Sequence, residues 1–99
     1  MENWHKLIIN KVLPVAKEFC EVHGGTLSVK DREIFIRISC GFFLTVQVFI
    51  IGKNSEPKIE VNGIGNSGFE TMRTVFTVKS PSYDIDLKEF RKALEATLR

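Results

Sequence analysis

The segment Phe42-Phe43-Leu44-Thr45-Val46-Gln47-Val48-Phe49-Ile50-Ile51 has the composition of a β-strand with apolar side chains on both faces. Side chains alternate across a strand, so Phe42 and every second residue to Ile50 share one face. The opposite face still carries Phe43, Phe49 and Ile51. One face can form the core of a small domain, but the second then needs its own cover, which a short chain has few elements to supply.

Four other segments repeat the period of two that is typical of strands. Their alternating apolar residues are Leu27 and Val29; Ile34, Ile36 and Ile38; Ile59 and Val61; and Met72, Phe76 and Val78. Turn-forming sequences separate them, such as Lys30-Asp31-Arg32, Gly52-Lys53-Asn54-Ser55 and the glycine-rich stretch 62–68. Because short connections place consecutive strands side by side, the pattern predicts a five-stranded antiparallel meander.

Spacings of three and four predict a first helix between Trp4 and Val22. Its expected inward stripe consists of Trp4, Leu7, Ile8, Val12, Val15, Ala16, Phe19 and Val22. The pair Gly24-Gly25 follows and is typical of a helix C-terminus. Pro14 removes a backbone donor within this stripe, so we expect the helix either to kink there or to restart with Asn10 as a cap.

A second helix is predicted to begin near Leu87. Asp86 and Glu89 form an acidic version of the capping box, and Ile85 and Phe90 occupy the two hydrophobic-staple positions. Four apolar residues make the expected inward stripe: Leu87, Phe90, Leu94 and Leu98. The residues expected to face water are Lys88, Arg91, Lys92, Glu95 and Arg99.

Length and composition indicate a single globular domain over residues 1–99. The chain is 43% hydrophobic and 26% charged, as ordinary folded domains are. Two amphipathic helices and one sheet bury their apolar sides most economically when both helices lie on the same face of the sheet. The predicted fold is therefore α+β: a two-layer sandwich in the order αβββββα, with an antiparallel five-stranded meander sheet and the N- and C-terminal helices on one face.

The other face of this sheet is the candidate contact surface. Its centre comprises Phe35, Phe43 and Phe49, with Arg37 and Arg73 at the rim. Gln47, Thr45, Ile51, Val75 and Thr77 lie on the same face. Aromatic residues and arginine are enriched in protein interfaces, so this mixture predicts a protein-binding site. Two alternatives stay open: the first helix wraps an edge and covers part of the face, or the sheet coils enough to hide it.

These features predict a small protein-binding module without enzymatic activity, with a regulatory or inhibitory role. The expected partner is another protein or a second copy of the chain in a homodimer. The alternative function is nucleic-acid binding, in which Lys88, Arg91, Lys92 and Arg99 contact phosphates and the sheet aromatics stack on bases. A formal net charge of +2 is mild, and glutamates interleave with these basic residues, which favours the protein partner.

The stretch Gly63-Ile64-Gly65-Asn66-Ser67-Gly68 matches the dinucleotide-binding pattern GxGxxG. A dinucleotide site needs a helix directly after the glycines. The residues that follow, including Thr71, Val75 and Val78, are β-branched and favour a strand. The sequence therefore predicts a hairpin loop here and no cofactor.

No catalytic or metal-binding residues are predicted. Cys20 and His23, with Cys40 or His5, match neither a familiar zinc spacing nor an activated thiolate, and Cys20 is expected to be a small core residue. A disulfide between the two cysteines stays open. Three glutamates, Glu33, Glu60 and Glu70, are expected at solvated strand edges.

The expected location is the cytoplasm, without membrane association. The N-terminal residues Met-Glu-Asn-Trp-His-Lys lead into an apolar stretch that is interrupted by Asn10, Lys11 and Pro14, unlike a signal peptide. No apolar run in the sequence is long enough to span a bilayer. Two cysteines are also too few for a disulfide framework of the kind found in small secreted domains.

Overall fold

The computed structural model describes residues 4–39, 43–53, 56–65, 70–79 and 82–98, with the backbone alone at residues 43 and 70–72. Its elements are α1 (Trp4–Val22), β1 (Thr26–Lys30), β2 (Glu33–Ser39), β3 (Phe43–Lys53), β4 (Glu56–Gly65), β5 (Glu70–Thr77) and α2 (Leu87–Ala96). The five strands form one open sheet in the order β1-β2-β3-β4-β5, and every neighbouring pair is antiparallel. The predicted α+β fold and its meander are confirmed.

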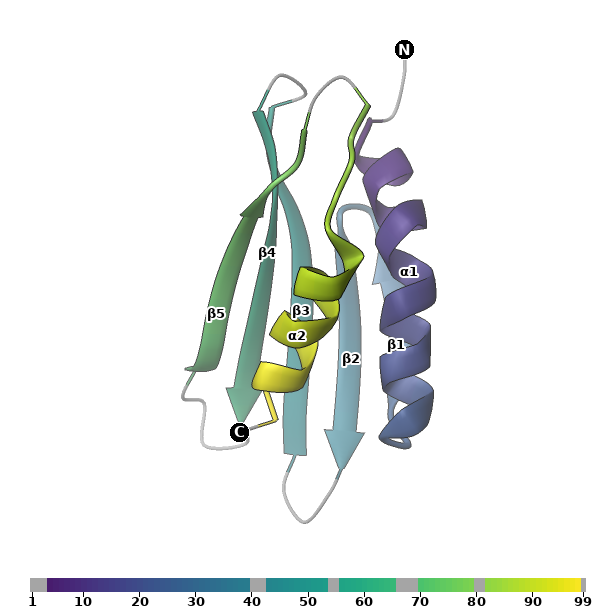
Figure 1. Cartoon of the computed structure of the whole chain (residues 1–99). Helices are drawn as coiled ribbons and strands as arrows, with labels where there is room; N and C mark the ends of the chain where they lie inside the picture. Colours follow the sequence, from purple (N-terminus) through teal and green to yellow (C-terminus); the bar gives the residue numbers. More distant parts are fainter. Residues whose placement is uncertain (1–3, 40–42, 54–55, 66–69, 80–81, 99) are drawn as a thin grey trace.

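Both helices lie on the same face of the sheet (Figure 1). They pack there side by side, and α1 also contacts β1, β2 and β3. One hydrophobic core fills the space between the layers, and its largest fully buried side chains include Ile8, Ile36, Leu44, Ile59, Phe90 and Leu94. One alternative was that α1 wraps an edge and covers part of the other face. Because α1 lies on the core side of the sheet, it does not cover that face.

Strand β3 is the centre of the sheet and supplies a complete inward row. Leu44, Val46 and Val48 have no exposed surface, and Ile50 is 2% exposed. Fully burying an aliphatic side chain of this size stabilises a fold by about 1.5–3 kcal/mol. This row therefore sets which side of β3 faces the helices, and the odd-numbered residues of the strand must face the opposite way.

Helix α1 runs without interruption through Pro14. Pro14 and Asn10 are both exposed, so the Asn10 carbonyl, which loses its usual amide donor, lies on the solvent side where water can satisfy it. The predicted restart capped by Asn10 was wrong. The predicted stripe was also wrong at Leu7 and Val22, which are 39% and 72% exposed, because the buried face is shifted toward Ile9 and Cys20.

Two successive glycines end α1 with a Schellman motif. The Gly25 amide donates to the Cys20 carbonyl at 2.9 Å, and the Gly24 amide donates to the Glu21 carbonyl at 3.3 Å. Gly24 has a φ of +65°, which is the left-handed conformation that this motif requires.

Helix α2 begins at Leu87, as predicted. The Asp86 side chain caps it by accepting hydrogen bonds from the amides of Lys88 and Glu89, at 3.0 and 3.3 Å. Leu87 itself is 41% exposed, so its predicted place in the inward stripe was wrong. It borders an open hollow beside α1, while Ala93 is buried with Phe90 and Leu94.

Strand β4 is longer than its alternation pattern predicted. It continues through Gly63, Ile64 and Gly65, which were expected in a loop. Gly63 lies between Val46 and Met72 in the pairing register and is buried, and a register shift follows it at Ile64. The β-strand predicted after the GxGxxG match is confirmed as β5, and residues 66–68 of the match lie outside the described residues. Neither helix in the described part of the chain has the length and apolarity needed to cross a bilayer.

Substituting two glycines tests the turns that set this topology. Gly24 and Gly52 both have positive φ, at +65° and +85°, but only Gly52 lies where a Cβ would meet a backbone atom, the Glu56 carbonyl oxygen. We expect Gly24→Ala to lower the free energy of unfolding by about 1 kcal/mol and Gly52→Ala by at least about 2 kcal/mol. Urea unfolding followed by circular dichroism measures both, and equal losses would contradict the close approach at Gly52.

Candidate functional site

The face of the sheet opposite the helices carries the predicted side chains whose positions the structure describes. The register aligns Phe35, Gln47, Asn62 and Arg73 in one row across β2, β3, β4 and β5. Phe49 lies in the next row, opposite Glu33 and Glu60. We call this surface the open face. The side chain of Phe43 lies outside the described part of the chain, although the strand begins at this residue.

An aromatic pair forms the apolar part of the open face. The rings of Phe35 and Phe49 meet edge to face, with centroids 6.5 Å apart and planes at 81°. Such a contact adds about 0.5–1.5 kcal/mol beyond the burial of the rings. Both side chains are half-buried, because each lies between neighbouring strands and no described helix or strand covers it. The pair is therefore a partly exposed apolar feature of the open face.

A hollow of about 370 Å³, open to solvent, lies beside Phe35 of this pair. It is lined by Thr26, Leu27, Ser28, Phe35, Ile36, Arg37 and Thr45. The Phe35 ring supplies an apolar wall, and the exposed Arg37 supplies a positive charge at the rim. The predicted residues Phe35 and Arg37 thus belong to one concave site.

A polar cluster occupies the other half of the open face. Arg73 Nη2 lies 3.2 Å from Glu60 Oε2, and Asn62 Nδ2 donates to Glu60 Oε1 at 2.8 Å. The Glu60 side chain is 14% exposed, so its expected place at a solvated edge was wrong. Asn62 is 7% exposed, and its Oδ1 accepts no hydrogen bond from the described residues.

Glu60 and Asn62 were missed as site residues because burial on this face depends on neighbours from other strands. Glu60 lies between Phe49 and Val75, and Asn62 lies between Gln47 and Arg73. Only the register reveals these neighbours. A buried carboxylate is tolerated when it is paired and hydrogen-bonded, as Glu60 is. The pair leaves Arg73, whose side chain is 58% exposed, as the outermost charge of the cluster.

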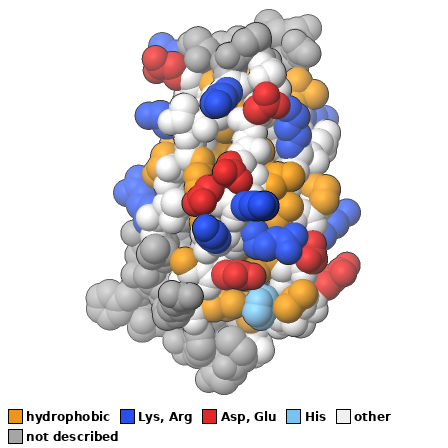
Figure 2. All heavy atoms as spheres, viewed as in Figure 1, with side chains coloured by type: hydrophobic (Ala, Val, Ile, Leu, Met, Phe, Trp, Pro, Cys, Tyr) orange, Lys and Arg blue, Asp and Glu red, His pale blue; other side chains and the backbone are white. Residues whose placement is uncertain are grey.

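The basic residues of α2 lie on the opposite side of the molecule. Arg91 Nη2 contacts Glu18 Oε2 at 2.8 Å, and Lys92 Nζ lies 3.6 Å from Glu89 Oε1. Figure 2, viewed from the helix side, shows basic and acidic side chains next to one another over this surface. Arg99 lies outside the described residues. The structure therefore does not bring the sheet aromatics and the basic residues of the C-terminal helix into one surface.

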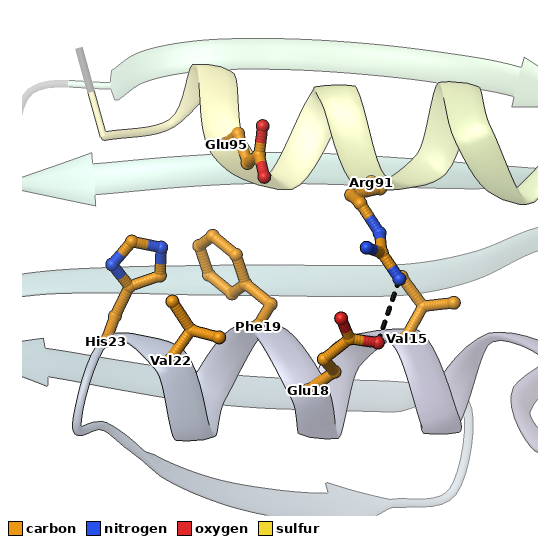
Figure 3. Close-up of a pocket in the computed structure, with 7 residues that line it drawn as sticks. All are labelled: Val15, Glu18, Phe19, Val22, His23, Arg91 and Glu95. Atoms are coloured by element: carbon orange, nitrogen blue, oxygen red, sulfur yellow. Dashed lines mark hydrogen bonds and ion pairs between the residues drawn. The ribbon is translucent and has the colours of Figure 1, made fainter.

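A small open hollow of about 40 Å³ lies between the two helices, and its lining could not be predicted from the sequence. Figure 3 shows Phe19 and Val22 of α1 facing α2, with Arg91 of α2 reaching across to Glu18. The remaining lining residues are Val15, His23 and Glu95. The Arg91–Glu18 ion pair spans this hollow, so the one arginine of the lining already has a carboxylate partner.

Cys20 behaves as a core residue, as the sequence predicted. It is a buried free thiol, and the His23 ring packs on Phe19 with centroids 4.8 Å apart. Burial raises the pKa of the Cys20 thiol above its ordinary value, and the negative charge of Glu21 raises it further. The thiol therefore stays protonated near neutral pH, which is the unreactive form. Among the described residues no cluster of His, Cys, Asp and Glu could hold a metal ion, and Cys40 lies outside them.

Compared with protein-family models, curated proteins and solved structures, the chain matches none.

Alkylation measures the state of Cys20 directly. We expect native Cys20 to react with iodoacetamide more than about tenfold more slowly than in the urea-unfolded chain at about pH 8, since its pKa is raised and its thiol is buried. Peptide mass spectrometry separates Cys20 from Cys40. Equal native and unfolded rates at Cys20 would contradict the buried, protonated thiol.

Proposed function

We propose that this chain is a non-enzymatic binding domain whose open face contacts another protein. The observation that carries the proposal is the one-sided cover of the sheet. Both helices pack on one face, while the opposite face presents the Phe35–Phe49 pair beside a hollow. Apolar surface next to a concavity and rimmed by arginine is typical of the energetic centre of protein interfaces.

The chemistry of the open face defines the kind of partner. An apolar side chain of the partner fits the hollow beside Phe35, and an acidic group fits the exposed Arg37 at its rim. Arg73 already pairs with Glu60, so it is a weaker anchor for a second carboxylate. A standard interface covers about 800 Å² on each partner, which is roughly an eighth of the 6233 Å² surface of this chain.

Binding rather than chemistry fits the groups on this face. The carboxylate of Glu60 is bound by Arg73 and Asn62. Such a group contributes to a rigid, hydrogen-bonded surface. We place this binding in the cytoplasm, because the described cysteine is a free buried thiol, the usual state in a reducing compartment. A regulatory or inhibitory role is our proposal for what the binding does.

Nucleic-acid binding is less well supported by the geometry. The two described Phe rings of the open face contact each other edge to face. The basic residues of α2 lie on the far side, where Arg91 and Lys92 pair with glutamates. A single strand would have to pass round an edge of the sheet to use both. Phosphate contacts make affinity fall with salt, so a titration with a single-stranded oligonucleotide at two salt concentrations tests this alternative.

Replacing Phe49 tests the proposed function. A photo-crosslinking phenylalanine analogue at position 49 first identifies the partner in cells, and the same analogue at the exposed Leu87 serves as the control. We then expect Phe49→Asp to weaken binding of the purified partner by about 30-fold or more, the effect of losing a hot spot worth about 2 kcal/mol. Isothermal titration calorimetry measures this loss.

Two further variants make that result decisive. Arg37→Glu changes only an exposed residue at the rim and should also weaken binding while the far-UV circular dichroism stays unchanged. Leu87→Asp, on the helix side, should leave the affinity unchanged. If Phe49→Asp and Arg37→Glu bind as tightly as the wild type, the open face is not the contact surface.

A further inference from the structure

The open sheet leaves two edge strands, β1 and β5, and they differ in what their free edges offer. An edge strand presents amide and carbonyl groups that no neighbour satisfies, which makes it a template for another strand. Natural proteins block such edges with short strands, proline, lysine or a covering element. Figure 1 shows β5 at one side of the sheet, with no described element beyond its outer edge.

One hydrogen bond determines which residues of β5 point outward. The Val78 amide donates to the Pro57 carbonyl at 2.9 Å, so Val78 faces β4. In an antiparallel pair, residues alternate between those that bond to the neighbour and those that point away. Phe76 and Thr74 therefore also bond to β4. The amide and carbonyl groups of Arg73, Val75 and Thr77 point to the free edge.

A second hydrogen bond gives the same alternation from the other side of the sheet. The Ile50 amide donates to the Arg32 carbonyl at 2.8 Å, so the even-numbered residues of β3 bond to β2 and the odd-numbered residues bond to β4. The register extends this alternation to β4, where the amide and carbonyl groups of Ile59 and Val61 point toward Phe76 and Thr74 of β5. Both hydrogen bonds therefore leave the same residues of β5, Arg73, Val75 and Thr77, pointing outward.

The edge of β1 is a poorer template. By the same alternation across β2, only Leu27 and Val29 of this five-residue strand have amide and carbonyl groups that point outward. The Gly25 amide, next in line, is already used to cap α1. Strand β5 is longer, with eight residues, its outward residues Arg73, Val75 and Thr77 include no proline and no lysine, and the Val75 side chain is 47% exposed.

We propose that β5 pairs antiparallel with β5 of a second copy of this chain, about a two-fold axis at Val75. A two-fold axis perpendicular to the sheet keeps the side chains of both copies on their own faces. Such an axis runs between two directly opposite residues, which are therefore the same residue in the two copies. With the axis at Val75, the two Val75 side chains cover each other, and Arg73 lies opposite Thr77 of the second copy. The result is a continuous ten-stranded sheet with the two open faces side by side.

Charge excludes the registers nearer Arg73, and the registers nearer the C-terminal end are excluded because the outward amide and carbonyl of Lys79 already bond to Asp84. An axis at Arg73 would place two arginines opposite each other, and an axis at Thr74 would leave them about 7 Å apart along the strands. With the axis at Val75 they are about 13 Å apart, which exceeds the screening length of about 8 Å at physiological ionic strength. Each Arg73 is also paired with Glu60 of its own copy. A second copy is therefore an acceptable neighbour for this edge.

Sedimentation velocity over a range of concentrations tests the proposal without any other partner. We expect the wild type to form a dimer that Val75→Pro abolishes. The Val75 amide makes no bond within the protomer by the alternation above, so proline at this edge position should leave the monomer folded. Val29→Pro is the matched control, because Val29 is 45% exposed, points outward and lies on the other edge. This variant should still dimerise.

Two readouts keep the proposal falsifiable if Val75→Pro fails to fold. Val75→Lys leaves the backbone intact but brings two ammonium groups together at the axis, and it should also give a monomer. Amide hydrogen exchange by NMR should slow at Arg73, Val75 and Thr77 as concentration rises, and should stay unchanged at Leu27 and Val29. A wild type that is monomeric throughout, or a dimer insensitive to Val75→Lys, would overturn the proposal.

Discussion

The packing of the inward row of β3 against the two helices is the constraint on which the rest of the structure depends. Leu44, Val46 and Val48 are fully buried in the middle of a five-stranded sheet. Side chains alternate along a strand. Because this row of β3 packs in the core, the other row must lie on the opposite face of the sheet. The cover on one side of the sheet and the aromatic surface on the other therefore have the same cause.

The open face combines features of a protein interior with access to solvent. Its Phe35 and Phe49 rings contact each other, and its Glu60 carboxylate and Asn62 amide are almost fully buried by neighbouring strands. Buried polar groups rigidify a surface when they are hydrogen-bonded, and Glu60 is bonded twice. A preformed surface of this kind loses little conformational entropy on binding, which is what a contact site needs.

The open face offers a partner side chains, and the free edge of β5 offers backbone hydrogen bonds. At β5 the same residues supply both. The residues whose amides point to the free edge, Arg73, Val75 and Thr77, are also those whose side chains lie on the open face. At β1 the outward residues, Leu27 and Val29, have side chains on the helix side instead. With a strand added at β5 the side chains of the hydrogen-bonded pairs would therefore lie on the open face, whereas with one added at β1 they would lie on the helix side.

The sequence by itself determined the elements, because periodicity, turns and caps are local. The alternation from Leu44 to Ile50 and the Asp86 cap at the start of α2 needed no knowledge of neighbours. Tertiary structure alone decided how each element is covered. It exposed Leu87 and Val22, buried Glu60, and separated the aromatic face from the basic helix. The reason is physical: burial depends on what lies opposite a residue, and those neighbours come from strands and helices distant in the sequence.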